Sequence, residues 1–274
     1  MRVKTLFALA TALLPAFVGI LPAQESQPEV RQAWRLKNFR ANWCIHFLLD
    51  STTADKRMPG DFVPAKASTV PDLAPGVRAR IVEEPGLADM IPSELCILRY
   101  DTTEVGDRVI AADRSDLDHS QFLVYWLIAA THEKVPGPVY FAKWIRTREF
   151  RLTRMAETAL INLQDVEGVA GKAEISQEDL YQVKIGRTQI TWEGHLAGDS
   201  SVAATPTTQQ WVFVTARGAR VPVAVDLQPE KSQLMVGYLR IVGKDELAKA
   251  LNAADVRLFG PLEWGGGGSI TFRR

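Results

Sequence analysis

Two apolar runs separated by a short turn signal constrain the fold of this chain more than any other feature. The first run covers residues 122–130 and is too short to span a membrane. The second covers residues 139–145, and Pro136-Gly137-Pro138 lies just before it. Runs of this length that are rich in aromatic and branched residues favour buried strands over helices. We therefore expect a central hairpin, with the other elements arranged around it.

The start of the chain predicts an export signal. Two basic residues precede an apolar stretch over residues 6–21, and Leu21-Pro22-Ala23 resembles a cleavage site before Gln24. This pattern predicts a signal peptide over residues 1–23 and a mature N-terminal extension over residues 24–40. An uncleaved anchor remains the alternative, because the apolar stretch is long enough to cross a bilayer. We expect an exported protein, periplasmic or extracellular, with no membrane span after leader cleavage.

Residues 41–274 are predicted to form a single domain, because no repeat or low-complexity linker divides them. The chain has 32 basic and 32 acidic residues, and removal of the two basic residues in the leader leaves a net charge of −2. No long run of either sign occurs. This charge pattern argues against nucleic acid as a partner.

The rest of the sequence alternates between strand patterns and short helix patterns. Strands are expected over residues 41–49, 94–100, 180–185, 188–196, 210–215, 220–227, 234–242 and 269–272. Helices are expected over residues 50–58, 77–84, 151–164 and 245–254. The predicted fold class is α+β, built on a curved antiparallel β-sheet or a cone-like β-barrel with a few covering helices.

Cys44 and Cys96 both lie in strand-like segments. In an oxidising compartment, two cysteines on neighbouring strands can form a disulfide. Two small apolar residues in a core would give the same pattern. The sequence leaves both alternatives open, and a disulfide would agree with export.

Motifs for metal binding or nucleophilic catalysis are incomplete. His132-Glu133 resembles the start of a zinc-protease helix, but Pro136 stands where the second histidine is needed. Gly198-Asp199-Ser200 lacks the flanking glycines of a nucleophile elbow. The glycines at 265–268 lack the Lys-Ser/Thr of a phosphate loop, and the acidic stretch at 113–119 lacks the glycine of a calcium loop. We expect no metal and no cofactor.

Lys143 is the remaining candidate for chemistry, because it lies inside the second apolar run. A desolvated lysine can lose its proton and attack a carbonyl to form a Schiff base. The alternative is an edge lysine whose amine reaches water. Alternation places Lys143 on the same strand face as Phe141. If this face lines an interior pocket, Phe141 contacts the ligand and the lysine needs a carboxylate such as Glu94.

The order of the elements resembles that of the acetoacetate decarboxylase-like superfamily. A strand, a short helix and Pro-Gly over residues 44–62 are followed by a strand, an acidic turn, the run at 122–130, Gly-Pro and a lysine-bearing strand. The match extends from about Ala41 to the last strand. The resemblance implies a cone-like antiparallel barrel with a largely apolar cavity. In the enzymes of this superfamily, a Schiff-base lysine lies beside a second lysine.

By this resemblance, Lys143 lies near the position of the catalytic lysine, and Arg40, Glu94 and Arg99 are candidates for polar groups of the cavity. The family's Tyr-Pro-Lys-Lys pattern is absent, since the neighbours of Lys143 are Ala142 and Trp144. The second lysine, which lowers the pKa of the first in the family, is therefore missing.

Three functions follow from these observations. The leading hypothesis is an exported protein that binds a small apolar or carbonyl-bearing molecule without turning it over. The second is a Schiff-base lyase, similar to a decarboxylase, that uses Lys143. The third is an accessory subunit of a cell-envelope assembly, with the Trp- and Gly-rich tail as its contact surface. The missing second lysine favours binding over catalysis, and the sequence does not predict an oligomeric state.

Overall fold

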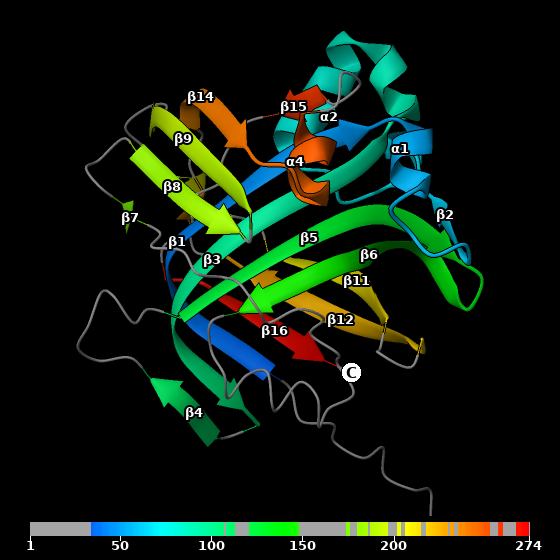
Figure 1. Cartoon of the computed structure of the whole chain (residues 1–274). Coiled ribbons are helices and arrows are strands. Elements are labelled where there is room, and N and C mark those ends of the chain that lie inside the picture. Colours follow the sequence, from blue (N-terminus) through cyan, green and yellow to red (C-terminus); the bar gives the residue numbers. More distant parts are fainter. Residues whose placement is uncertain are drawn as a thin grey trace, which may run out of the picture. The chain divides into compact units, whose positions relative to one another are not determined.

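A central sheet of long strands organises the computed structural model (Figure 1). The structure describes residues 34–106, 108–112, 121–147, 174–175, 180–185, 187–196, 202–203, 206–214, 218–229, 231–232, 235–252, 257–259 and 267–273. The predicted helix over residues 151–164, most of the acidic stretch and Gly198-Asp199-Ser200 lie outside these ranges. All described residues belong to one compact unit, Gln32–Arg274.

The described strands form a ten-stranded sheet in the order β15-β1-β16-β12-β11-β6-β5-β3-β4, with β2 paired to β5. Pairing is antiparallel except between β11 and β6, which run parallel. The strands of this sheet are β1 (Trp34–Leu49), β2 (Phe62–Pro64), β3 (Ile91–Val105), β4 (Arg108–Ala112), β5 (Gln121–His132), β6 (Val135–Thr147), β11 (Thr207–Val214), β12 (Arg220–Gln228), β15 (Arg257–Phe259) and β16 (Ser269–Arg273).

The sheet curves so strongly that β1 has paired neighbours from both ends of the strand order. Trp34 lies opposite Val105 of β3 and also opposite Phe272 of β16. In the same β1–β3 pairing Cys44 lies opposite Cys96, and a disulfide joins them. The predicted α+β fold on a curved, mainly antiparallel sheet with a few helices is confirmed.

One buried apolar cluster covers the inner face of the curved sheet. It takes side chains from β1, β3, β5, β6, β11, β12 and β16, including Leu36, Leu98, Tyr125, Tyr140, Trp211, Val223 and Ile270. Strands so far apart in the order can share a cluster only on the side toward which the sheet curves. This inner face is the largest part of the core.

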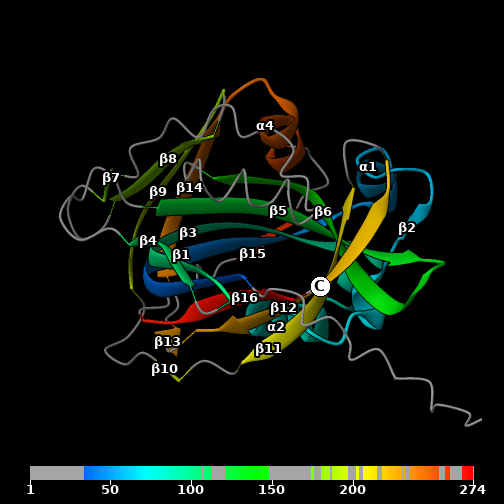
Figure 2. The same cartoon turned by 90° about the horizontal axis from the view of Figure 1, so that it is seen from below.

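The helices are α1 (Ser51–Asp55), α2 (Pro75–Glu83) and α4 (Glu246–Leu251), and the 3-10 turns are η1 (Ala67–Thr69) and η2 (Pro85–Asp89). Helices α1 and α4 and a second sheet cover the outer face, whereas η1, α2 and η2 form a separate cluster with Leu48 of β1. Ala54, Leu247 and Ile190 pack with β1, β3 and β5 residues such as Leu95 and Trp126. Figure 2 shows α4 beside β5 and β6, on the side away from β11 and β12.

The second sheet has four described strands in the order β14-β9-β8-β7. These strands are β7 (Glu174–Ile175), β8 (Leu180–Ile185), β9 (Thr188–Leu196) and β14 (Met235–Val242), and a separate pair joins β10 (Val202–Ala203) to β13 (Lys231–Ser232). No helix among the described residues is both long and apolar enough to cross a bilayer.

Several predicted boundaries differ from the observed ones, among them those of β1, β3 and the central hairpin turn. The first strand begins at Trp34 and not at Ala41, so part of the predicted extension pairs with β3 and β16. The turn of the central hairpin is only Glu133-Lys134, and Pro136 and Pro138 lie within β6. Prolines are tolerated in strands near irregular pairing, and the β5–β6 register shifts between Thr131 and His132.

Candidate functional site

Lys143 lies at a β-bulge in the strand that was predicted to carry the chemistry. Leu127 of β5 is opposite Ala142 and Trp126 is opposite Trp144, so Lys143 has no residue across from it. Its Nζ donates to the backbone carbonyl of Arg57 at 3.0 Å and lies 3.1 Å from Oε1 of Glu246. The lysine side chain therefore reaches the end of α1 and the start of α4.

The two faces of β6 belong to different clusters. Val139 and Phe141 pack with Phe62 and Val212, whereas Tyr140 and Ala142 belong to the inner cluster. The ring centroids of Phe141 and Phe62 are 4.9 Å apart. The carboxylate beside Lys143 is that of Glu246, and the assignment of Phe141 and Lys143 to a ligand site stays a prediction.

Glu94 lies on β3 directly opposite His46 of β1, and both residues are buried. His46 Nδ1 and Glu94 Oε2 are 3.6 Å apart. Tyr140 is buried in the inner cluster, and burial, followed by the negative charges of Glu94 and Asp72, raises the pKa of its hydroxyl. Tyr140 is therefore a neutral hydrogen-bond donor in an apolar region.

For the two predicted arginines, Arg40 and Arg99, the structure describes the backbone but not the side chain. Arg40 lies at the register shift in β1 between Phe39 and Ala41, and Arg99 of β3 is paired with Ala41 and Phe122. The side chains of Arg40 and Arg99 lie outside the description. Neither one can be assigned to a site from its position in the pairing.

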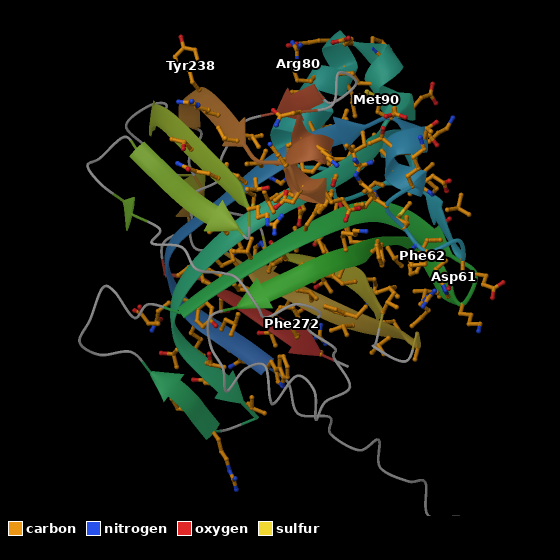
Figure 3. All side chains as sticks on the ribbon, viewed as in Figure 1. Asp61, Phe62, Arg80, Met90, Tyr238 and Phe272 are labelled. Atoms are coloured by element: carbon orange, nitrogen blue, oxygen red, sulfur yellow. A yellow bond between two sulfur atoms is a disulfide. The ribbon has the colours of Figure 1, made fainter. Side chains whose placement is uncertain are left out.

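A cavity of about 840 Å³ lies at the turn of the β5–β6 hairpin. Its apolar wall comes from β2 and β6 and includes Val63, Val135 and Pro138. Figure 3 shows Asp61 and Phe62 beside this turn, on the segment that enters β2. The cavity is open to solvent, and Val63 is 62% exposed although it is apolar.

The polar groups of the cavity come from three separate segments. They are the hydroxyls of Thr69 and Thr131, the carboxylates of Asp61 and Glu133, and His132. A mainly apolar wall with a few convergent polar groups is typical of small-molecule sites.

Asp61 is fixed by Arg220 of β12. The guanidinium donates from Nε to Oδ2 at 2.7 Å and from Nη2 to Oδ1 at 2.6 Å, which is a bidentate pair. These bonds hold the pKa of Asp61 at about 2. Arg220 also lies over the ring of Phe62, with its Cζ 5.7 Å from the centroid.

His132 completes this group, and its side chain is only 2% exposed. The backbone N–H of Lys134 donates to Nδ1 at 3.2 Å, and Nε2 lies 3.3 Å from Asp61 Oδ2. Because Nδ1 accepts a hydrogen bond, the proton of the neutral ring is on Nε2 and is donated to Asp61. No group of three or more His, Cys, Asp or Glu residues within the described ranges is placed to hold a metal ion.

Sequence reasoning missed Asp61 and Arg220. They are separated by 159 positions, and neither lies in a recognisable motif. His132 was considered only as a metal ligand and was placed in the hairpin turn, whereas the structure places it in β5 opposite Phe62.

The matches of this chain with known proteins are all to solved structures. Acetoacetate decarboxylase from Legionella pneumophila is 9% identical, with 96% of each chain covered and a TM-score of 0.49. An acetoacetate decarboxylase-like enzyme from Sphingomonas wittichii RW1 is 12% identical, covering 89% of this chain and 91% of that chain, with a TM-score of 0.43.

A further acetoacetate decarboxylase structure is 10% identical, covering 89% of this chain and 87% of that chain, with a TM-score of 0.46. No protein-family model matches the sequence, and no curated protein matches it.

Proposed function

We propose that the protein binds a small apolar or carbonyl-bearing molecule in the cavity at the β5–β6 turn and does not turn it over. The observation that carries this proposal is the cavity itself, whose volume of about 840 Å³ suits a small organic molecule. Val63, Val135 and Pro138 supply an apolar wall, and the hydroxyl of Thr131 can donate to a carbonyl oxygen. The hydroxyl of Thr69 already donates to the backbone carbonyl of Lys66 at 2.8 Å.

The exposure of Val63 supports a ligand at this wall. Val63 is 62% exposed and lines the cavity, while its neighbour Phe62 is buried. A bound apolar group would remove the Val63 side chain from water, which is favourable in proportion to the area covered.

Binding without catalysis accounts for the described residues better than a Schiff-base reaction does. A Schiff-base lysine must present a neutral amine to a bound carbonyl. The amine of Lys143 contacts a carboxylate and a backbone carbonyl, and Lys143 does not line the cavity. Among the described residues that line the cavity, none is a lysine.

We also propose that the protein is exported to the periplasm or the exterior. The leader pattern supports this proposal, and so does the Cys44–Cys96 disulfide, because such bonds persist in oxidising compartments. N-terminal sequencing of the exported protein should find Gln24 first, and an intact Met1 in that material would contradict cleavage of the leader.

Titration with cyclohexanone, followed by two-dimensional NMR of the backbone amides, tests the binding proposal. Saturable shifts are expected at Val63, Thr131 and their neighbours. The Val63→Ser variant should weaken binding, whereas Val82→Ser should not, because Val82 is a more exposed valine on α2 that does not line the cavity. Absence of saturable shifts, or an equal effect of the two variants, would refute the proposal.

Native mass spectrometry of the purified protein can then identify a co-purified ligand.

A further inference from the structure

The charged residues that line the cavity at the β5–β6 turn are acidic. Asp61 and Glu133 both contribute carboxylates to the lining, and no Lys or Arg is among the described residues that line it. The nearest guanidinium, that of Arg220, is bonded to both oxygens of Asp61 and does not line the cavity. A ligand in this cavity therefore meets negative groups without a cationic partner of its own.

Glu133 carries the uncompensated charge. It occupies the two-residue hairpin turn and is exposed, and it forms no ion pair with a described residue. Asp61, by contrast, is already paired with Arg220 and accepts from His132. The carboxylate that remains available to a ligand is that of Glu133.

We infer that the small apolar or carbonyl-bearing ligand of this cavity also carries a protonated amine, so that it is an organic cation with an apolar body. This inference rests on the proposed binding function and names the class of ligand. The ammonium would donate to Glu133, and the hydroxyl oxygens of Thr69 and Thr131 could accept its other protons. Val63, Val135 and Pro138 would cover the apolar body.

Ligands of other charge fit this lining less well. An anion would approach the Glu133 carboxylate, which has no ion-pair partner among the described residues, and like charges repel. A hydrated metal ion would leave the apolar wall unused, and metal sites need several ligands that converge on one point. An amine with an apolar chain uses both parts of the cavity.

Three probes with the same six-carbon chain and different head-group charges test whether the cavity prefers a cation. Hexylammonium, hexanol and hexanoate are titrated into the mature protein by isothermal calorimetry at low ionic strength and about pH 7, where an alkylamine is protonated. We expect the order hexylammonium, hexanol, hexanoate, from tightest to weakest. Added salt should weaken only the binding of hexylammonium.

Two variants test whether Glu133 causes the preference for hexylammonium. Glu133→Gln should weaken hexylammonium binding roughly threefold to fivefold, as expected for an exposed ion pair, and leave hexanol binding unchanged. Glu83→Gln is the matched control, because Glu83 is an exposed carboxylate on α2 that does not line the cavity. The Val63→Ser variant should weaken the binding of hexylammonium and of hexanol alike.

The outcomes distinguish the two proposals. If hexanol and hexanoate bind as tightly as hexylammonium, or if Glu133→Gln has no effect, the inference of a cationic ligand is wrong while the binding function stands. If none of the three probes binds and cyclohexanone does not bind either, both proposals are wrong.

Discussion

A single carboxylate, Asp61, joins three segments that are distant in the sequence. It precedes β2, pairs with Arg220 of β12 and accepts a hydrogen bond from His132 at the end of β5. The hydrogen bonds from Arg220 are the largest cause of the lowered pKa of Asp61. This residue therefore holds one wall of the cavity in place.

The stability that Asp61 contributes should depend on pH. Its folded-state pKa of about 2 lies below the ordinary value of 3.8, so the stabilisation is complete above about pH 4 and is lost as pH falls through the folded value. In urea denaturation, Asp61→Asn should destabilise the protein more at about pH 5 than at about pH 2. If the variant and the wild type differ in free energy of unfolding by the same amount at both pH values, the charge of Asp61 does not contribute to the stabilisation by Arg220.

Lys143 is expected to be structural. In the presence of acetoacetate, borohydride reduction followed by peptide mass mapping should find no adduct on Lys143, because its amine is bound by Glu246 and the Arg57 carbonyl. Lys143→Met should lower the free energy of unfolding by about 1 kcal/mol or less, since Glu246 is half exposed and solvent screens the pair. Lys249→Met, at an exposed position of α4, is the control. A covalent adduct on Lys143 would support the Schiff-base alternative.

Among the elements, α4 depends on one capping residue. Asp245 Oδ1 accepts from the backbone N–H of Ala248 at 3.0 Å and also from the hydroxyl of Thr188 at the start of β9. The same carboxylate thus caps the helix and ties it to the second sheet.

Asp245→Ala should lower the free energy of unfolding by about 1 kcal/mol, as expected for loss of an N-cap. Asp245→Asn should retain most of this stability, because the amide oxygen can accept the same bonds. Urea denaturation followed by circular dichroism measures both. Equal losses in the two variants would mean that the carboxylate charge, and not the cap, is what stabilises the helix.

Most elements could be predicted because their apolar residues recur at regular spacing. The prediction failed where this spacing is interrupted. Strands β8 and β9 have the predicted bounds. The start of β1 was missed because Asn38 has a positive φ of 58° and the register shifts after Phe39, which breaks the alternation that begins at Trp34. A bulge of this kind removes the period on which a strand prediction depends.

The orientation of β6 could not be predicted for a different reason. Tyr140 and Ala142 on one face and Val139 and Phe141 on the other are all buried. When both faces of a strand are apolar, the sequence does not show which one is inner. Alternation placed Lys143 with Phe141, but the long-range packing of α1 and α4 decides that this face is outer.

At the scale of the whole molecule, the Cys44–Cys96 disulfide closes a loop across the β1–β3 pair, and its cysteines have a sequence separation of 52. On the chain-entropy model, a loop of this length stabilises by about 4 kcal/mol. A Cys44→Ala, Cys96→Ala double variant should lose stability of this order in urea denaturation. Reducing agent should destabilise the wild type and leave the double variant unchanged. Two free thiols in non-reduced peptide mapping of the exported protein would contradict the disulfide.

The pairing of β1 with β16 has a consequence for biosynthesis. The two strands lie near opposite ends of the described chain, yet Trp34 and Phe272 are register partners. While a ribosome is still making the region before β16, the Trp34 end of β1 has no partner on that side, and neither does β12. Such open strand edges are sites of intermolecular association. Completion of the sheet must therefore wait until β16 has emerged, so the nascent polypeptide depends on protection from aggregation until then.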